Sequence, residues 1–325
     1  MKYCFIINPA SGKTTTKEGL EERIKDRCAM AEKECHILFT QKVGDAREYI
    51  PRFCREHTDS EIRFFACGGD GTLCEAVNGV MALDESDRAR VSLGVIPVGT
   101  GNDFVRNFEP KELFGNIDAQ LEATPVKIDL IKCNDFYAVN MINIGFDCQV
   151  VCKTDEFKHK KFIPSRLAYI CGLVVTLIKK PGVQMTVSAD ADAADSKGLL
   201  LTTFANGSFC GGGFHSNPEA QLCDGKIDTL FVKNISRTKF LSLVGSYKKG
   251  THLCGKYEDI LTNFKAKSYN IEFDRPTEIS VDGEVLKVDE VQMSCLRGAL
   301  SFLVPKGIVN APAQARTEKE EMTVS

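Results

Sequence analysis

Three glycine-rich turns in the first third of the chain, each directly after a run of β-forming apolar residues, constrain this sequence most. They are Asn8-Pro9-Ala10-Ser11-Gly12-Lys13, Gly68-Gly69-Asp70-Gly71-Thr72 and Gly99-Thr100-Gly101-Asn102-Asp103. Bare backbone N–H groups and helix N-termini at such strand ends are good phosphate-binding sites. We therefore expect the three turns to form one shared cradle for a nucleotide.

The pattern around these turns predicts an α/β domain over residues 1–125. Strands are expected at 3–8, 36–41, 62–67 and 91–98, with helices at 17–35, 46–57 and 73–83 and Asp45 as the N-cap of the second helix. Such alternation indicates a mostly parallel sheet between helices, which binds ligands at the carboxyl ends of its strands. All three turns fall at those ends.

The pattern changes after Pro125. Strands are expected at 126–133 and 136–144, joined by a turn at Asn134-Asp135, and then at 183–189, 199–205, 227–232, 269–273, 278–285 and 291–304. Helices are expected near 165–179 and 238–248, and a solvated loop at 190–196. We predict an antiparallel β-sandwich over 126–298, a strand near 299–305 that rejoins the first domain, and a disordered tail over 306–325.

Composition excludes several classes of protein. The net charge of −3 gives no attraction to nucleic acid. The fourteen cysteines include no C-x-x-C pair, which favours reduced thiols and a cytosolic location. The longest apolar stretch, 170–178, is far shorter than the about twenty residues that a membrane span needs.

The common nucleotide-binding motifs do not fit. A P-loop requires glycine where Ile7 stands, and the dinucleotide-binding pattern requires glycine where Phe104 stands. The chain is therefore neither a P-loop enzyme nor an ordinary dehydrogenase.

Over roughly residues 1–305 the sequence resembles the bacterial diacylglycerol kinase-like lipid kinases, which are related to sphingosine kinases and, more distantly, to NAD kinases and 6-phosphofructokinases. The resemblance rests on the three glycine turns with their flanks, and on Val126-Lys127-Ile128-Asp129, Asn143-Ile144-Gly145-Phe146-Asp147, Asp224-Gly225 and Asp282-Gly283-Glu284. It implies an α/β nucleotide domain and a β-sandwich domain, with the active site in the cleft between them.

The resemblance also implies which residues bind ATP and magnesium. Asp70, Asp103 and Asp129 are expected to form an acidic network around Mg²⁺–ATP. From the chemistry of phosphoryl transfer, we expect Lys13 to neutralise phosphate charge. The other residues expected at the nucleotide are Asn8, Pro9, Ala10, Ser11, Gly12, Thr40, Gly68, Gly69, Gly71, Thr72, Leu73, Glu75, Gly99, Thr100 and Asn102.

A structural magnesium site is implied in the loop before Lys226, with the Asp224 side chain and the carbonyls of Gln221 and Lys226 as ligands. Many relatives carry a second aspartate where this chain has Cys223. Glu284 matches the family's general base. Read without the resemblance, Asp282-Gly283 is equally a two-residue hairpin turn beside a solvent-exposed Glu284.

These features predict a lipid kinase that transfers the γ-phosphate of ATP to a lipid hydroxyl. Diacylglycerol is the first candidate for the acceptor. A sphingoid base, another lipid or NAD as acceptor, and a regulator that binds nucleotide or lipid without catalysis, remain the alternatives. The expected location is cytoplasmic, peripheral at the inner face of the membrane, and a symmetric homodimer is the default oligomeric state.

The expected route to lipid is a basic segment followed by an apolar helix. Lys158, His159, Lys160 and Lys161 precede the apolar stretch 167–178, and the pair could lie on an anionic bilayer. A core-facing helix with solvated lysines at its ends fits the same pattern equally well. A second basic cluster, Lys248, Lys249 and Lys256, has the same two interpretations.

Overall fold

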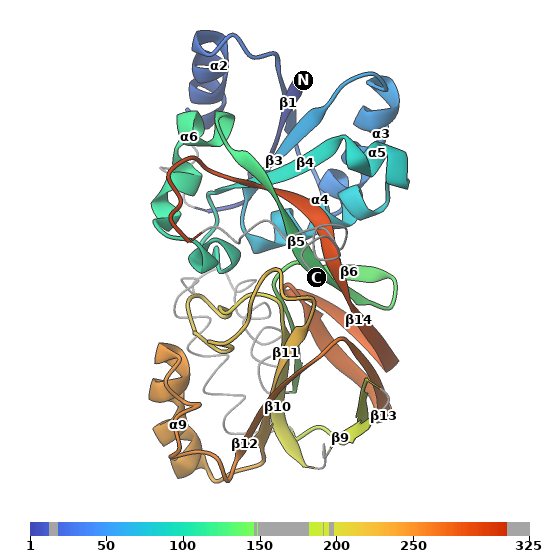
Figure 1. Ribbon diagram of the computed structural model, residues 1–325, viewed down its shortest axis with the longest axis vertical. Coiled ribbons are helices and arrows are strands. Elements are labelled where there is room, and N and C mark those ends of the chain that lie inside the picture. The colour runs from blue at the N-terminus through green and yellow to red at the C-terminus, as the bar shows by residue number, and fades with distance from the viewer. Residues whose placement is uncertain (13–18, 146–147, 149–181, 191, 195–197, 311–325) are drawn as a thin grey trace, which may run out of the picture. The chain divides into compact units, whose positions relative to one another are not determined.

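The computed structural model describes residues 1–12, 19–145, 148, 182–190, 192–194 and 198–310 (Figure 1). It divides into two compact units. Unit 1 comprises Met1–Leu130, Leu222–Gly225 and the chain from Leu296 onward, and unit 2 comprises Ile131–Gln221 and Lys226–Cys295. The N-terminal unit is α/β with parallel strands and the other is a β-sandwich, so the predicted fold class is confirmed.

Unit 1 is built on a parallel sheet. Its strands are β1 (Lys2–Ile7), β2 (Cys35–Phe39), β3 (Ile62–Gly68), β4 (Val91–Pro97) and the last part of β14 (Glu284–Val304), in the order β2-β1-β3-β4-β14. Every neighbouring pair is parallel. Parallel strands are buried on both faces, which explains their nearly continuous apolar sequences.

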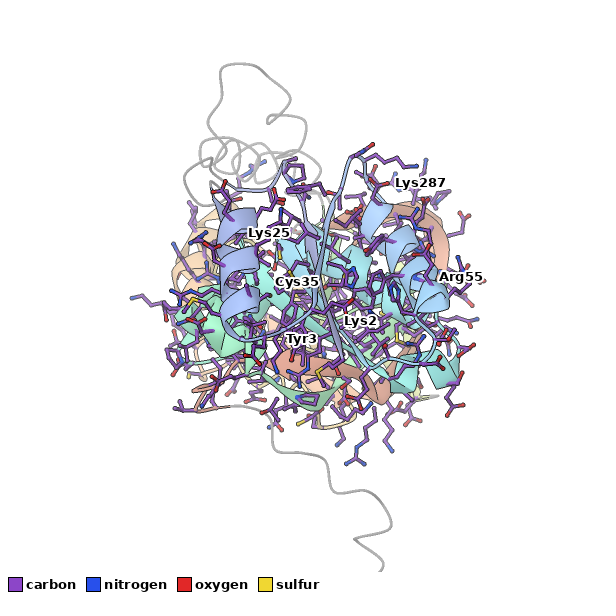
Figure 2. The ribbon with its side chains drawn as sticks, turned by 90° about the horizontal axis from the view of Figure 1, so that it is seen from above. Lys2, Tyr3, Lys25, Cys35, Arg55 and Lys287 are labelled. Carbon is purple, nitrogen blue, oxygen red and sulfur yellow. The ribbon has the colours of Figure 1, made fainter. Side chains whose placement is uncertain are left out.

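Helices cover both faces of this sheet. On one face α2 (Leu20–Met30) and α6 (Ile117–Leu121) pack against Phe5, Phe65 and Ile96. On the other face α3 (Asp45–Glu56) packs against α4 (Asp70–Met81). Figure 2 shows Lys25 of α2 and Arg55 of α3 on opposite sides of the strands that carry Tyr3 and Cys35. Three short helices complete unit 1, at Glu85–Ala89 (α5), Phe104–Asn107 (η1) and Lys111–Gly115 (η2).

The start of α3 differs from the prediction. The N-cap is Gly44, in the left-handed region at φ 90°, and Asp45 is the first helical residue. The Asp45 carboxylate accepts hydrogen bonds from the amides of Gln41 (2.6 Å) and Lys42 (3.1 Å), which precede the helix. The aspartate therefore closes the loop between β2 and α3 instead of capping the helix.

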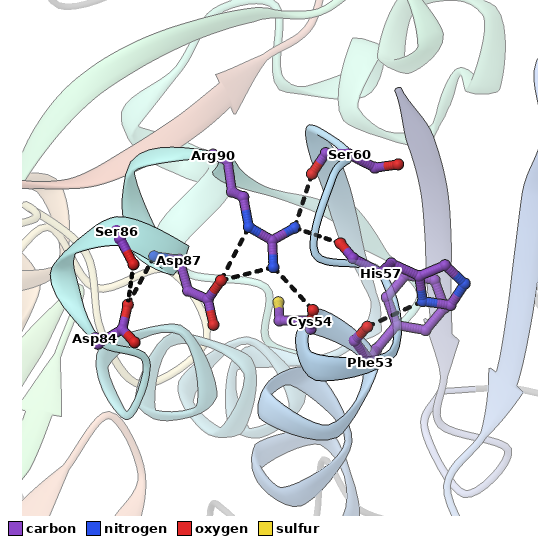
Figure 3. A network of polar contacts seen from close by, with 8 residues as sticks. All are labelled: Phe53, Cys54, His57, Ser60, Asp84, Ser86, Asp87 and Arg90. Carbon is purple, nitrogen blue, oxygen red and sulfur yellow. Dashed lines mark hydrogen bonds and ion pairs between the residues drawn. The ribbon is translucent and has the colours of Figure 1, made fainter.

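Arg90 joins four segments of unit 1 (Figure 3). Its guanidinium donates to the Asp87 carboxylate at 2.9 and 2.7 Å, and to the carbonyls of Cys54 (2.8 Å), His57 (2.7 Å) and Ser60 (2.7 Å). The network ties the end of α3 and the loop that follows it to the start of β4. Five donors in a planar fork suit this geometry, which lysine could not reproduce.

The described strands of unit 2 pair mainly antiparallel with one another. They are β5 (Thr124–Cys133), β6 (Phe136–Ala138), β7 (Met141–Gly145), β8 (Met185–Ala189), β9 (Asp192–Ala194), β10 (Leu199–Ala205), β11 (Ile227–Lys233), β12 (Leu261–Ala266), β13 (Ser268–Val281) and β14. β5 and β14 contribute residues to both units. The core lies between inward-facing side chains such as Ile144, Val187, Phe204 and Tyr269.

Strand β13 serves both layers of the sandwich. Its first half pairs with β8 and its second half with β7. The register shifts between Glu272 and Thr277, at the segment that contains Pro276. A bulge or proline bends a strand, and here the bend lets one strand cross between the layers.

Several strand predictions for unit 2 were wrong in detail. The predicted strand 278–285 is interrupted by a turn at Asp282-Gly283, and 136–144 is two strands, β6 and β7. β9 lies inside the predicted loop 190–196, and β12 was not predicted. The turn at Asn134-Asp135 is confirmed, because Cys133 pairs with Phe136. The predicted helix near 238–248 corresponds to α9 (Arg237–Lys249), whereas 165–179 lies outside the described residues.

Among the described residues, no helix combines the length and apolar character needed to cross a bilayer. Every cysteine in the described part of the chain is a free thiol.

Candidate active site

The carboxyl ends of β1, β3 and β4 are joined by backbone hydrogen bonds. The amide of Asn8, after β1, donates to the carbonyl of Cys67 in β3 at 3.0 Å. The amides of Val98 and Gly99, after β4, donate to the carbonyl of Gly68 at 3.0 and 3.1 Å. The three glycine turns therefore lie side by side at one edge of the parallel sheet.

Close backbone packing explains the glycines in these turns. A Cβ on Gly12 would overlap the carbonyl of Val98, and a Cβ on Gly99 would overlap the backbone of Gly69. Of these three glycines, only Gly12 has a positive φ, at 71°. Gly12 is therefore favoured both by its left-handed backbone and by its close contact, whereas contact between the turns alone requires glycine at 99.

Asn8 organises the first turn. Its Nδ2 donates to Thr72 Oγ1 at 3.1 Å, and its Oδ1 accepts from the Ala10 amide at 2.9 Å. Its carbonyl accepts from the Ser11 amide at 3.2 Å. Thr72 occupies the space that a Cβ on Gly68 would need. Asn8 thus connects the glycine turn after β1 to the N-terminal end of α4. The backbone N–H groups at that end have no partners within the helix.

Asp70 is the first residue of α4, and the third turn wraps around it. Its Oδ1 accepts from the amides of Asp103 (2.8 Å) and Phe104 (3.2 Å). Burial, followed by repulsion from the Asp103 carboxylate, raises the pKa of Asp70 to about 6, although the amides oppose the shift. The fold therefore holds a carboxylate where its charged form is unfavourable, as is common at functional sites.

The neighbouring carboxylate has a cationic partner that the sequence analysis missed. Asp103 is 7% exposed, and its Oδ1 accepts from Arg106 Nε at 3.1 Å. Arg106 also donates to the carbonyl of Gly101 at 3.2 Å. The sequence offered one signal for this pair, because Asp103 and Arg106 are three residues apart at the start of a helix. That spacing is common in proteins and is therefore weak evidence.

Asn102 presents a buried oxygen toward this site. It has φ 50°, and its Nδ2 donates to the carbonyl of Gly99 at 2.8 Å. Its Oδ1 is buried and has no hydrogen-bond partner among the described residues. An unsatisfied buried acceptor calls for an explanation, and a bound cation or hydrated ligand would supply one.

The remaining residues predicted at the nucleotide are distributed around these turns. Pro9, Ala10 and Thr100 are exposed, whereas Leu73 and Thr40 are buried. The Thr40 amide donates to the Ile7 carbonyl at 2.9 Å, which places the end of β2 beside the end of β1. Glu75 Oε2 accepts from the amide of Ala46 in α3 at 3.3 Å. Gly71 lies in the first turn of α4, and Lys13 falls outside the described residues.

Asp129 is fully buried in β5 and binds backbone amides. Its Oδ2 accepts from Gly225 and its Oδ1 from Gly298, both at 2.7 Å, and its own amide donates to the Leu222 carbonyl at 2.7 Å. Burial raises its pKa, and the two amides oppose that shift. The carboxylate thus connects β5, the 222–225 loop and β14, and the amides of the loop and of β14 are the partners that a buried charge needs.

Of the predicted metal ligands, Asp224 lies within this same loop, and Gln221 and Lys226 flank it. No group of three or more His, Cys, Asp or Glu side chains in the described part of the chain could hold a metal ion. The predicted site would need only one carboxylate and two carbonyls, an all-oxygen set of the kind that Mg²⁺ accepts alongside water. Asp224 contributes to raising the Asp129 pKa and the Arg297 guanidinium opposes that rise, so side chains of both charges lie near the loop.

In unit 2, Asp282 and Gly283 form a two-residue turn between β13 and β14. Their φ values are 48° and 95°, and Val281 pairs with Glu284 across the turn. The Asp282 carboxylate accepts from three successive amides at 2.7, 3.1 and 2.7 Å, those of Val139, Asn140 and Met141. The hairpin is therefore fixed to its neighbouring segment, and the partly exposed Glu284 side chain begins the strand that follows.

The basic segment at 158–161 and the apolar stretch at 167–178 lie outside the described residues. The second basic cluster, Lys248, Lys249 and Lys256, is described and exposed.

Two family models match the chain. The diacylglycerol kinase catalytic domain matches residues 2–133, and the YegS C-terminal NAD kinase beta sandwich-like domain matches residues 140–304. Together they account for most of both units.

Curated relatives and solved structures agree with these matches. A diacylglycerol kinase of Staphylococcus aureus (strain JH9) is 30% identical over 308 residues, covering 94% of this chain and 93% of that protein, and the enzyme of strain Newman gives the same values. A crystal structure of a diacylglycerol kinase from Bacillus anthracis str. Sterne has a TM-score of 0.70 at 24% identity, covering 95% of this chain and 98% of that one. A second structure from that organism gives 0.72 at 25% identity, with coverage of 94% and 97%.

Proposed function

The chain belongs to the diacylglycerol kinase-like lipid kinases, and we propose that it transfers the γ-phosphate of ATP to the free hydroxyl of diacylglycerol, giving phosphatidic acid. The acceptor is suggested by the names of the curated relatives. The observation that carries the proposal is the convergence of three glycine turns around the Asp70 carboxylate. Phosphoryl transfer is catalysed mainly by positioning and charge stabilisation, and this edge of the sheet offers groups for both.

We assign phosphate binding to the backbone of the three turns and to the N-terminus of α4. Glycine at positions 12, 68 and 99 allows the turns and Thr72 to pack tightly against one another, which holds their backbone N–H groups together at one edge of the sheet. Asn8 and Thr72 hold each other, so their orientation is set before nucleotide binds. This preorganisation reduces the entropy lost on binding.

Asp70 and Asn102 are the side chains we assign to the magnesium that accompanies ATP, with Asp103 and Asp129 as further acidic groups. The buried, unpartnered Oδ1 of Asn102 and the carboxylate of Asp70 are hard oxygen donors, as Mg²⁺ prefers. The ion would neutralise phosphate charge when bound. Asp224, with the carbonyls of Gln221 and Lys226, is our proposed structural magnesium site.

Glu284 is our proposed general base. Its carboxylate would take the proton of the acceptor hydroxyl as that oxygen bonds to the γ-phosphorus and the bond to the β,γ-bridging oxygen breaks. Asp282 acts as a positioning residue, because three backbone amides hold it next to Glu284. Help from a general base is typically worth about 10²–10⁴-fold in rate.

Labelled ATP and diacylglycerol in mixed micelles test these roles. Glu284→Gln should lower kcat by about 10²–10⁴-fold with little change in KM for ATP. Asp70→Ala should abolish turnover. Glu290→Gln, an exposed glutamate on the same strand, is the matched control and should retain full activity. Turnover at the normal rate in both Glu284→Gln and Asp70→Ala would refute the assignments.

The acceptor is tested with a panel of hydroxyl compounds. Diacylglycerol should be phosphorylated faster than a sphingoid base, another glycerolipid or NAD. Phosphorylation of NAD but of no lipid would contradict the proposed acceptor. Because diacylglycerol resides in membranes and ATP in the cytosol, we further propose that the enzyme works peripherally at the cytoplasmic face of the membrane.

A further inference from the structure

One segment of unit 2 is unusually basic. The chain has 44 acidic residues in 325, yet none lies between Asp228 and Glu258. That segment carries the basic residues Lys233, Arg237, Lys239, Lys248, Lys249 and Lys256. A protein with a net charge of −3 therefore concentrates positive charge around α9, shown in orange in Figure 1.

Helix α9 is a fixed platform. Ser236 caps its N-terminus by accepting from the Lys239 amide at 3.2 Å, and Gly250 ends it in the left-handed region at φ 71°. Phe240, Leu243 and Tyr247 on its inner face pack with Leu230 and Val232 of β11. The two caps and the buried inner face fix the orientation of α9, so its opposite face is exposed to solvent.

That outer face joins positive charge with apolar surface. Arg237, Leu241, Gly245 and Lys248 follow one another at helical spacing, and all four are exposed. Leu241 is 62% exposed in the middle of this stripe. No acidic residue lies anywhere on the helix.

Two neighbouring loops extend the same surface. Lys248 Nζ lies 5.8 Å from the centre of the Phe214 ring, which is partly buried against the core beneath α9. Lys256 Nζ lies 5.1 Å from the ring of Tyr257, whose hydroxyl donates to the Ser242 carbonyl at 2.9 Å. Lys239 is paired with Asp259 at 2.5 Å. In the described part of the chain, by contrast, no ion pair holds Lys248, Lys249 or Lys256.

We propose that this α9 surface (Arg237, Leu241, Lys248, Lys249 and Lys256) docks the enzyme on an anionic bilayer. The inference rests on the proposed function, because a diacylglycerol acceptor must be reached in a membrane. A bilayer fits both halves of the surface: anionic headgroups attract the cations, and hydrocarbon accepts the exposed side chain of Leu241. Each basic residue at such a surface is worth about 1 kcal/mol, or roughly fivefold in affinity.

Vesicle flotation of the full chain tests this surface. The vesicles contain phosphatidylglycerol and phosphatidylcholine, or phosphatidylcholine alone, without diacylglycerol or ATP. The wild type should bind the anionic vesicles, less so at high salt. Lys248→Glu combined with Lys249→Glu should weaken that binding at least about 25-fold. Leu241→Gln should weaken it several-fold without removing its salt dependence.

Matched variants separate docking from other effects. Arg55→Glu combined with Lys287→Glu makes the same change in net charge at exposed positions elsewhere, labelled in Figure 2, and should bind as the wild type does. Lys248→Gln combined with Lys249→Gln removes the two positive charges without adding negative charge at the end of the helix. This variant should lose the affinity that two basic residues contribute, about 25-fold. Circular dichroism verifies that each variant is folded.

The readouts distinguish this proposal from the proposed function. Turnover on a short-chain diacylglycerol in neutral detergent micelles should be unchanged in the α9 variants. Anionic vesicle binding that survives Lys248→Glu with Lys249→Glu, or that falls equally in the Arg55 and Lys287 control, would overturn the docking surface. A wild type that binds vesicles through α9 but phosphorylates no lipid would contradict the function and leave the docking surface standing.

Discussion

The charge on Asp70 is unfavourable in this fold and is nevertheless retained. Burial and the Asp103 carboxylate raise its pKa from 3.8 to about 6, while Arg106 pairs with Asp103 and not with Asp70. A group that destabilises the free protein is worth keeping where a bound cation or ligand later compensates its charge.

This property predicts an unusual pH dependence of stability. Because the folded pKa lies above the unfolded one, the folded state holds the extra proton between about pH 4 and pH 6, and stability falls as pH rises through that window. Asp70→Asn should remove this slope and stabilise the free protein above pH 6 by up to about 3 kcal/mol, while abolishing turnover. Urea unfolding at a series of pH values measures both effects.

A companion variant provides the control. Asp103→Asn removes the repelling charge, so the slope should move to lower pH without disappearing. If Asp70→Asn were no more stable than the wild type at pH 7, the assignment of the raised pKa to Asp70 would be wrong.

Arg90 acts as a cross-link between secondary-structure elements. It lies between α5 and β4, and its side chain hydrogen-bonds to α5 and to the end of α3 with the loop that follows. Arg90→Lys keeps the charge but cannot reach three carbonyls and a carboxylate at once. We expect a loss of about 2–3 kcal/mol in the free energy of unfolding, because hydrogen bonds to charged groups are worth about 1.5–3 kcal/mol. Urea denaturation measures it.

Arg88→Lys, at a nearby arginine, is the control for Arg90→Lys. Among the described residues, the Arg88 guanidinium makes only long contacts, at 3.8 Å to Met81 Sδ and 3.4 Å to the Leu83 carbonyl. It should shift the urea midpoint little. Equal midpoints for Arg90→Lys and the wild type would show that the network contributes nothing to stability.

The hairpin between β13 and β14 links a structural role to the proposed chemistry. Asp282→Ala leaves three amides without their acceptor and releases the turn that precedes Glu284. We expect kcat to fall by about 10- to 100-fold, because small displacements of a catalytic group have effects of that size. KM for ATP should stay near its normal value.

Asp282→Asn keeps acceptor oxygen at the turn and should recover part of the lost rate, a rescue that unspecific destabilisation would not produce. Steady-state kinetics alongside thermal unfolding separate the two effects. A kcat that follows the loss of stability in every variant would argue against a positioning role.

Local pattern predicted much of unit 1, because its strands are buried on both faces and its glycine turns interrupt them sharply. The carboxyl ends of parallel strands must share one edge, so the convergence of the turns at Asn8, Gly69 and Gly99 followed from topology. Asp45 was misassigned because a carboxylate at a helix start can also accept amides that precede it.

Unit 2 was harder to predict because its strands depend on distant partners. β13 continues through Pro276 by bending, and the strand expected at 278–285 overran the hairpin turn at Asp282-Gly283, which the sequence itself had offered as an alternative. The partners of Asp129, at Gly225 and Gly298, lie far from it in the sequence. No local signal reports such contacts, although the burial of Asp129 could be read from its apolar neighbours.

Strand β14 has a consequence for how such an enzyme can be divided. It starts with Glu284 in unit 2 and ends in unit 1, where Phe302 pairs with Leu93 of β4 and the amide of Gly298 satisfies Asp129. A fragment that stops at residue 133, the limit of the catalytic-domain match, would expose the edge of β4 and leave a buried acid without two of its donors. We therefore expect the matched catalytic domain to need β14 from the end of the chain in order to fold stably.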